Sequence, residues 1–323
     1  MESVLYGFVD YEPVYQYTIT NGVMEADIIT YGATLTALRV PNGNGVTQNV
    51  VLGRDSLEEY ETLPGRYGAT IGPVANRIEN GRFTLGDKVY RVECNSGAHC
   101  LHGGHKGYDK RVWKVVQQEQ DTLVLVYHSP DGEGGFPGNR KIALRYRLRK
   151  DHSLAISYFA VSDKDTILNL TNHSYFNLNG PEASTEHMRL WVNADQITPV
   201  DEQMIPHDDF APVDGTIYDF RTPRVVAGEA ATTPERGYFD NNFVLNGSGM
   251  RKVAKLTSNL TGYAMEVITD QPGMQVFTGN PKGIALETQH FPNAINCLHY
   301  PSIVLPVGAE YRADTVYHFI PPR

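Results

Sequence analysis

The chain has 323 residues, of which 28 are Lys or Arg and 37 are Asp or Glu, so its formal net charge is −9. A surface with this acidic excess repels a phosphate backbone, which argues against nucleic-acid binding. No apolar run approaches the roughly 20 residues that span a bilayer, which argues against a membrane role.

The N-terminus and the cysteines predict a cytoplasmic protein. The first residues, MESVLYGFVDYEPVYQY, lack the basic start and apolar core of a secretory signal. Cys94, Cys100 and Cys297 form an odd set without a CxxC pair. This pattern is typical of reduced thiols and does not suggest a disulfide framework.

The first predicted elements are a hairpin and a short helix. Residues 14–32, VYQYTITNGVMEADIITYG, hold two β-rich runs around Asn21-Gly22, a dipeptide that suits the positive φ angles of a tight turn. Residues 56–63, SLEEYETL, predict a short helix that is capped by Asp55 or Ser56.

Strand patterns then continue to the end of the chain. Apolar and polar residues alternate from Ile142 to Leu148 and again from Leu154 to Tyr158, which predicts a half-buried antiparallel hairpin. Further strand runs, each bounded by Gly, Pro, Asn or Asp, occupy residues 82–93, 115–129, 187–200, 253–270, 273–280, 283–291 and 302–311. Residues 225–231, VVAGEAA, resemble a second short helical piece. No linker or low-complexity stretch interrupts the strands, so we predict one large antiparallel β-domain over residues 1–323, with closed or stacked sheets and few short helices.

The segment AHCLHGGHKGYD, residues 98–109, places His99, His102 and His105 at every third position. Three imidazoles this close suggest a metal site. However, Gly103-Gly104 disfavours a helix, and in a strand or loop this spacing points neighbouring side chains in divergent directions. Since no second ligand pair follows at zinc spacing, we expect no metal here.

Unusual polar clusters occur elsewhere in the chain. They are GPVANRIENGRF with Asn76 and Arg77, LTNHSYFNLNG with His173, YFDNNFVLNG with Asp240, and GMQVFTGNPKGIALETQHFPN with Gln275 and Glu287. The motifs LHGG, NHSYFNL, FDNNFVL and LETQHFP follow in the order found in one family. From about Tyr31 to the C-terminus the sequence resembles the galactose mutarotases, the aldose 1-epimerase family.

The resemblance implies a large β-sandwich with an open cleft that binds an aldohexose in its pyranose form. It implies that the sugar hydroxyls are held by Asn76, Arg77, His102, His173, Asp240 and Gln275, and that Glu287 is the base. It assigns no role to His99 or His105. The sequence departs from the family pattern after QHFP, where Asn293 stands in place of an acidic residue, so one local loop contact is in question.

The chemistry of anomer exchange needs two proton carriers, which we place on opposite sides of the hemiacetal carbon. Glu287 is our base and His173 our acid, and we expect nearby carboxylates to favour the protonated imidazole. Alternation along the strand places Glu287 on the face opposite Leu286, so that one face is core and the other is cleft. Two positioned proton carriers require neither a metal nor an organic cofactor.

Each of these residues alone would more often be structural, and only their joint occurrence favours an enzyme. Three alternatives stay open. The first is a sugar-binding protein without activity on the same fold, against which the presence of both Glu287 and His173 argues. The second is a hexose-phosphate 1-epimerase, which would need a cluster of Arg or Lys that the motifs do not show. The third is a glycosidase that uses Asp240 and Glu287 as its carboxylate pair.

Overall fold

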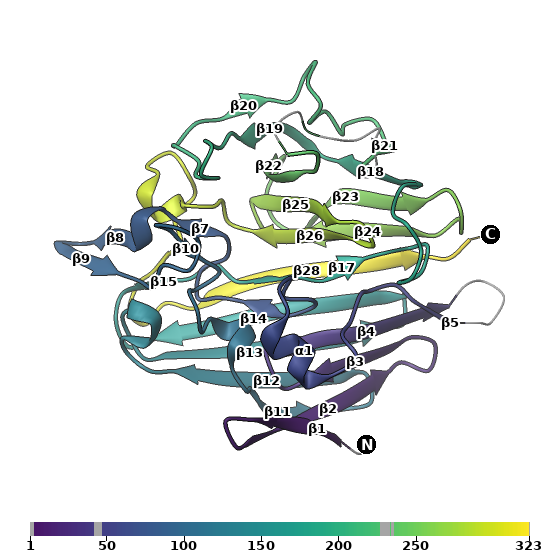
Figure 1. Cartoon of the computed structure of the whole chain (residues 1–323), viewed down its shortest axis with the longest axis horizontal. Coiled ribbons are helices and arrows are strands. Elements are labelled where there is room, and N and C mark those ends of the chain that lie inside the picture. Colours follow the sequence, from purple (N-terminus) through teal and green to yellow (C-terminus); the bar gives the residue numbers. More distant parts are fainter. Residues whose placement is uncertain (1–2, 42–46, 227–232, 234–235, 323) are drawn as a thin grey trace.

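The computed structural model of the chain describes residues 3–41, 47–226, 233 and 236–322. Within these ranges the regular structure is almost entirely antiparallel β-strand (Figure 1), which confirms the predicted all-β class. One α-helix, α1 (Leu57–Thr62), lies in the described ranges, and Ser56 caps it as predicted by accepting from the backbone N–H of Glu59. No helix of the described residues is long and apolar enough to cross a membrane.

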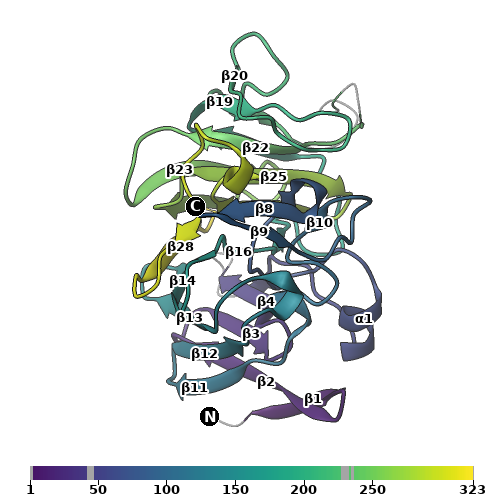
Figure 2. The same ribbon diagram turned by 90° about the vertical axis from the view of Figure 1, so that its left-hand side faces the viewer.

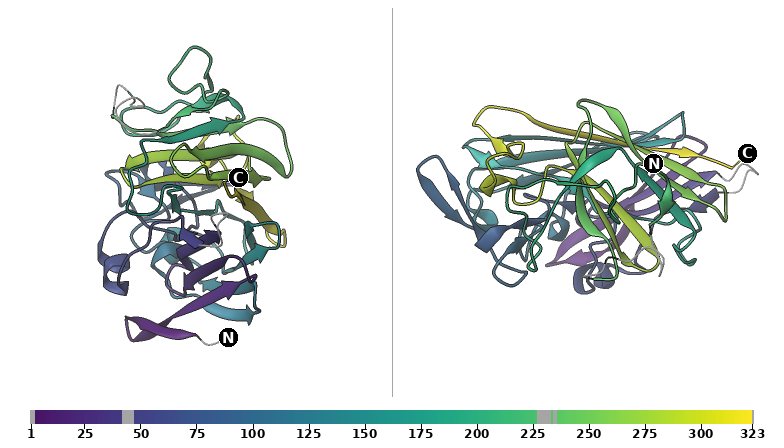
Figure 3. Two further views of the ribbon diagram at one scale, coloured as in Figure 1. Left: turned by 90° about the vertical axis from the view of Figure 1, so that its right-hand side faces the viewer. Right: turned by 90° about the horizontal axis from the view of Figure 1, so that it is seen from above.

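The largest sheet has nine strands, which follow one another from the lower to the upper part of the molecule in Figure 1. Its strands, in spatial order, are β11 (Lys114–Gln118), β12 (Thr122–Ser129), β13 (Arg140–Arg149), β14 (Ser153–Ser162), β28 (Tyr311–Ile320), β24 (Ala264–Thr269), β23 (Arg251–Ser258), β18 (Met188–Val192) and β21 (Arg224–Val225). The N-terminal hairpin lies beyond β11 at one end of the molecule, and β19 and β20 lie at the other (Figures 1 and 3).

Two smaller sheets complete the architecture. The five-stranded sheet contains β1 (Val4–Val9), β2 (Glu12–Thr20), β3 (Glu25–Ile29), β4 (Thr34–Pro41) and β5 (Thr47–Asn49). The six-stranded sheet has the order β17 (Tyr175–Phe176), β26 (Gly283–Gln289), β25 (Gly273–Asn280), β22 (Asp240–Leu245), β19 (Ala194–Thr198) and β20 (Ala211–Pro212). The described residues also form four separate two-stranded ladders: β6 (Thr70–Ile71) with β16 (Thr171–Asn172), β7 (Arg77–Ile78) with β10 (Cys100–Leu101), β8 (Arg82–Leu85) with β9 (Lys88–Arg91), and β15 (Thr166–Ile167) with β27 (Val304–Leu305).

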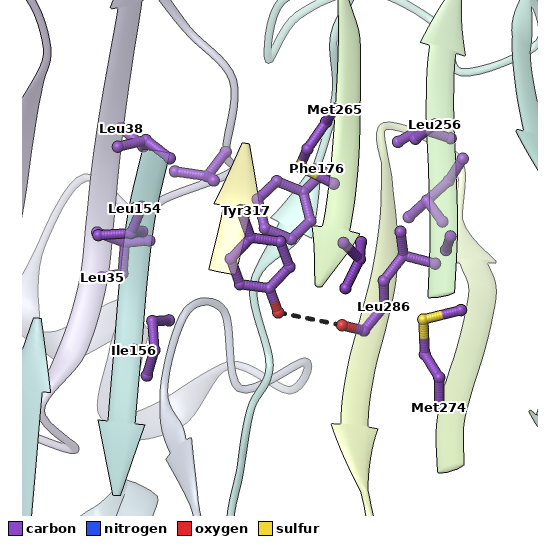
Figure 4. Packing of buried hydrophobic residues seen from close by; sticks show 14 of the residues in the cluster. Leu35, Leu38, Leu154, Ile156, Phe176, Leu256, Met265, Met274, Leu286 and Tyr317 are labelled. Atoms are coloured by element: carbon purple, nitrogen blue, oxygen red, sulfur yellow. Dashed lines mark hydrogen bonds between the residues drawn. The ribbon is translucent and has the colours of Figure 1, made fainter. Parts of the chain in front are cut away.

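One continuous apolar core joins the three sheets. Figure 4 shows side chains from the three sheets meeting there: Leu35, Leu38, Leu154, Ile156, Leu256, Met265, Met274 and Leu286. The rings of Phe176 and Tyr317 are tilted by 44° with their centroids 4.7 Å apart, and the Tyr317 hydroxyl donates to the carbonyl of Leu286 at 3.2 Å. The nine-stranded sheet therefore forms one layer of a sandwich and the two smaller sheets form the other. In side view, β14 and β28 lie on the flank of the molecule opposite α1 (Figure 2).

Most predicted strand pairs are present. Asn21 and Gly22 form the turn between β2 and β3, where Gly22 has a φ of 86° and the Asn21 side chain accepts from the N–H groups of Val23 and Met24. The hairpin of β13 and β14 pairs in register from Arg140 and Ser162 to Arg149 and Ser153. Cys94, Cys100 and Cys297 are free thiols.

Two of the differences between the prediction and the structure lie in the C-terminal half of the chain. The run at residues 302–311 contains the two-residue strand β27 and ends at Tyr311, the first residue of the long strand β28, whose remainder was not predicted from the sequence. The expected helix at 225–231 lies largely outside the described residues, and Val225 at its start belongs to strand β21.

Candidate active site

A polar pocket of about 210 Å³ lies where the six-stranded sheet meets the ladders β6/β16 and β7/β10. Of the seven residues predicted for the site, six line it: Asn76, Arg77, His102, His173, Asp240 and Glu287. The volume is below the roughly 300–1,000 Å³ of sites for drug-sized ligands, so a single sugar ring is of suitable size. A larger pocket of about 600 Å³, near Asp201, Ala211 and Arg236, contains none of the seven.

His173 and Glu287 are in direct contact in this pocket. His173 follows β16, Glu287 lies in β26, and His173 Nε2 is 3.5 Å from Glu287 Oε1. Both side chains are almost fully buried, and His173 Nδ1 and Glu287 Oε2 have no hydrogen-bond partner among the described residues. Each group therefore has one buried polar atom that no described residue satisfies.

The electrostatics of this pair overturn one expectation. Burial, reinforced by the charge of Arg66, lowers the pKa of His173 to about 3, whereas carboxylates were expected to keep it protonated. Burial and the charge of Asp240 raise the pKa of Glu287 well above its usual value, and Arg66 opposes this shift. Desolvation thus favours the uncharged form of both groups, and the pair is suited to carry one proton between them.

The arrangement of the pair also differs from the expected one. We expected acid and base to lie on opposite sides of the hemiacetal carbon, but the two groups are neighbours. Strand β26 is buried along its entire length, and its two faces differ as expected, since Leu286 lies in the core and Glu287 lines the pocket.

His102 is locked in one orientation by the backbone of Asn76. The N–H of Asn76 donates to His102 Nδ1 at 3.1 Å, and the N–H of His102 donates to the carbonyl of Asn76 at 2.9 Å. Since Nδ1 is an acceptor, the neutral ring carries its proton on Nε2. Burial, together with Arg66, His173 and Arg77, lowers the pKa of His102 well below its usual value. His102 therefore offers an N–H donor.

Three further predicted residues carry polar groups on other strands: Arg77 on β7, Asp240 on β22 and Gln275 on β25. The Gln275 amide donates to Asp240 Oδ1 at 2.7 Å across β25 and β22, which orients the carboxylate, and Gln275 itself does not line the pocket. Burial lowers the pKa of Arg77, while Asp240 opposes this change. A guanidinium and a carboxylate in one small pocket can hold adjacent hydroxyls as donor and acceptor.

The three histidines of residues 98–109 diverge. His102 enters the pocket, whereas His99 accepts from the N–H of Asn80 at 3.0 Å and contacts Gln203 Oε1 at 2.7 Å. His105 is exposed. Gly103 has a φ of 86°, and a Cβ there would lie 2.2 Å from the carbonyl oxygen of Gly72. This glycine allows the loop to pack against the chain before Asn76.

A different trio could be considered for a metal. His102, His173 and Glu287 offer nitrogen and oxygen atoms that all lie within 4.8 Å of one another. Two guanidinium groups, of Arg66 and Arg77, line the same pocket and would repel a divalent cation. We therefore interpret the three side chains as polar groups of a ligand pocket and not as metal ligands.

Arg66, Tyr175 and Phe277 also line the pocket but were not predicted from the sequence. The rings of Tyr175 and Phe277 lie 6.1 Å apart and give the pocket an apolar wall. Tyr175 stands two positions after His173 in NHSYFNL, so it belongs to the same motif. Arg66 belongs to no motif that we recognised.

Asn293, which stands where the family pattern has an acidic residue, holds three segments of the chain together through hydrogen bonds. Its N–H donates to the carbonyl of Arg77 at 2.9 Å, its side-chain oxygen accepts from the N–H of Glu79 at 3.0 Å, and its amide donates to the carbonyl of Pro206 at 3.3 Å. An aspartate could not donate the last of these bonds. Its φ of 57° also suits asparagine.

The chain is similar to known proteins over most of its length. The family model described as aldose 1-epimerase matches residues 15–318. A galactose mutarotase from Bos taurus is 38% identical over 325 residues, covering 95% of this chain and 94% of the relative. An aldose 1-epimerase from Escherichia coli K12 is 35% identical, covering 96% of each. The crystal structure of a galactose 1-epimerase from Lactobacillus acidophilus superposes with a TM-score of 0.87 at 29% identity, covering 100% of this chain and 99% of the other.

Proposed function

The chain belongs to the aldose 1-epimerase family of isomerases, and on this premise we propose that it interconverts the α and β anomers of free aldohexoses such as D-galactose and D-glucose. The observation that carries the proposal is the contact between His173 and Glu287 inside a pocket sized for one sugar ring. Anomer exchange needs one proton taken from O1 and one given to the ring oxygen, and these two oxygens share the carbon C1.

We assign Glu287 as the base and His173 as the acid of ring opening. Glu287 accepts the proton of the C1 hydroxyl, the bond between C1 and the ring oxygen breaks, and protonated His173 gives its proton to that oxygen. The product is the open-chain aldehyde, with Glu287 protonated and His173 neutral. Rotation about C1–C2 then presents the other face of the carbonyl.

Reclosure reverses both proton transfers. The hydroxyl that contains the former ring oxygen attacks C1, His173 takes its proton, and protonated Glu287 gives a proton to O1. The pair therefore holds a single proton at the start and at the end of each half-reaction. Burial of both groups favours neutral His173 with protonated Glu287, which is the state that the pair reaches after ring opening.

The remaining side chains are proposed to hold the sugar. The Nε2–H of His102, the guanidinium of Arg77 and the side chain of Asn76 face the same pocket, and so does the Asp240 carboxylate that Gln275 orients. Tyr175 and Phe277 suit the apolar C–H surface of a pyranose. None of these contacts calls for an organic cofactor.

The test is anomer exchange itself. NMR of freshly dissolved α-D-galactose should show a faster approach to anomeric equilibrium with the protein than without it. Binding of galactose by titration without any acceleration would favour a non-catalytic sugar-binding protein. Hydrolysis of an aryl galactoside would instead favour a glycosidase, and exchange of a hexose 6-phosphate alone would favour the phosphate-specific activity.

A further inference from the structure

Arg66 lies beside the proposed acid and base although it belongs to none of the recognised motifs. It lines the same pocket as His173 and Glu287, and its φ of 48° follows Gly65 at 108°. A non-glycine residue in the left-handed region is uncommon and is retained where the surrounding structure determines it.

The loop that carries Arg66 is hydrogen-bonded to both sides of His173. The N–H of Gly68 donates to the carbonyl of His173 at 3.0 Å, and the N–H of His173 donates to the carbonyl of Ala69 at 2.9 Å. The N–H of Ala69 in turn donates to the carbonyl of Arg66 at 3.1 Å. The backbone thus fixes the position of Arg66 relative to the imidazole.

A buried carboxylate anchors the guanidinium. Arg66 Nε is 3.2 Å from Asp109 Oδ2, and the Asp109 side chain is only 3% exposed. Gly107 leaves room for this carboxylate, because a Cβ there would lie 2.8 Å from Asp109 Oδ1. The guanidinium is held from one side by Asp109 and borders the pocket on the other.

We propose that Arg66 is a positioning residue of the reaction, whose guanidinium is anchored by Asp109 and stabilises the Glu287 carboxylate across the pocket. This inference rests on the proposed function. It adds a residue that acts through the proton-carrying pair and not by transferring a proton itself.

The charges around the pair support this role. Arg66 lowers the pKa of His173 and that of Glu287, although burial remains the larger influence on each. The other titratable or charged groups that face the pair are His102, Arg77, Tyr175, Asp240 and Tyr317. The positive charge of Arg66 favours loss of a proton from the pair as a whole. Without this charge the pair of His173 and Glu287 should keep its protons to higher pH.

The experiment compares pH–rate profiles for galactose anomer exchange in wild type, Arg66→Gln, Arg66→Lys and Arg54→Gln. In Arg66→Gln the limbs of the profile should move to higher pH by about half a unit or more, with a lower kcat. Arg66→Lys should restore most of the wild-type profile. Arg54, which stacks on Tyr67 at 4.0 Å and does not line the pocket, is the matched control and should leave the profile unchanged.

Each outcome decides a separate point. An unchanged profile in folded Arg66→Gln overturns the inference, and so does a raised KM without a pH shift, because Arg66 would then be a sugar ligand. If Arg66→Gln folds poorly, Arg66→Met can replace it in the comparison of pH–rate profiles, because methionine also removes the charge and keeps an unbranched aliphatic side chain. Wild-type protein without anomer exchange would overturn the proposed function instead.

Discussion

His173 Nε2 and Glu287 Oε1 lie 3.5 Å apart and both side chains are almost fully buried, although the two residues come from separate parts of the chain. This separation is long for a hydrogen bond. The ring oxygen and O1 of a pyranose are attached to one carbon, so two neighbouring side chains can reach both.

The first prediction separates catalysis from binding. Glu287→Gln keeps the size of the side chain but cannot accept a proton, so galactose should bind within roughly tenfold of wild type while the rate falls by about 10²-fold or more. Titration and NMR exchange on the same folded samples measure both. Glu119→Gln, an exposed change outside the pocket, is the control. Full activity in Glu287→Gln would show that the base lies elsewhere.

The second prediction concerns the coupling of the pair. His173→Gln should lower the rate about as much as Glu287→Gln, because either loss prevents the exchange of one shared proton. The double variant should then lose far less than the product of the two single losses. Rate effects that multiply would mean that the two groups act in independent steps.

The third prediction follows from the lowered pKa of His173. An ordinary histidine titrates near pH 6.5, but burial holds the pKa of His173 at about 3. The rate should therefore show no acid limb as the pH falls through 6.5. It should decline on the alkaline side, where the pair loses its proton above the raised pKa of Glu287. An acid limb near 6.5 that disappears in His173→Gln would contradict this reading.

The hairpins could be predicted from the sequence because their signals are local. Alternation sets one face of β13 and β14 toward the core, and Asn21-Gly22 supplies the backbone angles of its own turn. Strand β28 was missed because Thr315, Val316 and Tyr317 are all buried, so polar and apolar residues do not alternate there. Thr315 instead contacts the hydroxyls of Thr269 and Thr288.

The motifs located residues of the pocket but not their mutual geometry. The contact of His173 with Glu287 depends on how β16 and β26 are placed by the fold. The direction of the His173 pKa depends on burial and on Arg66, neither of which a sequence motif displays. The feature that distinguishes Arg66 is its positive φ. A single arginine in a loop sequence does not reveal this backbone angle, so Arg66 could not be predicted as a site residue.

A fourth prediction tests the residues assigned to the sugar hydroxyls. Arg77→Ala and His102→Ala should each lower kcat/KM by about 10- to 100-fold, the range for a hydrogen bond lost in a buried polar site. Arg82→Ala and His105→Ala, which change exposed residues nearby, are the matched controls. If both pocket variants kept wild-type kinetics while folding normally, the proposed sugar site would be misplaced.

The last prediction uses stability to ask whether Glu287 is protonated in the free protein. Its folded pKa is raised above the usual value near 4.3, so the folded state holds a proton that the unfolded chain releases as the pH rises. The free energy of unfolding of the wild type should therefore fall relative to that of Glu287→Gln as the pH rises from about 4.3 toward the folded pKa. The fall should be at most about 1.4 kcal/mol per pH unit. Urea unfolding of both proteins between pH 5 and 8 measures the difference in free energy. His173 is present in both proteins, so its titration in the unfolded state cancels in the comparison. A difference that stays constant with pH would mean that the pair carries no extra proton, and the single-proton mechanism would lose its basis.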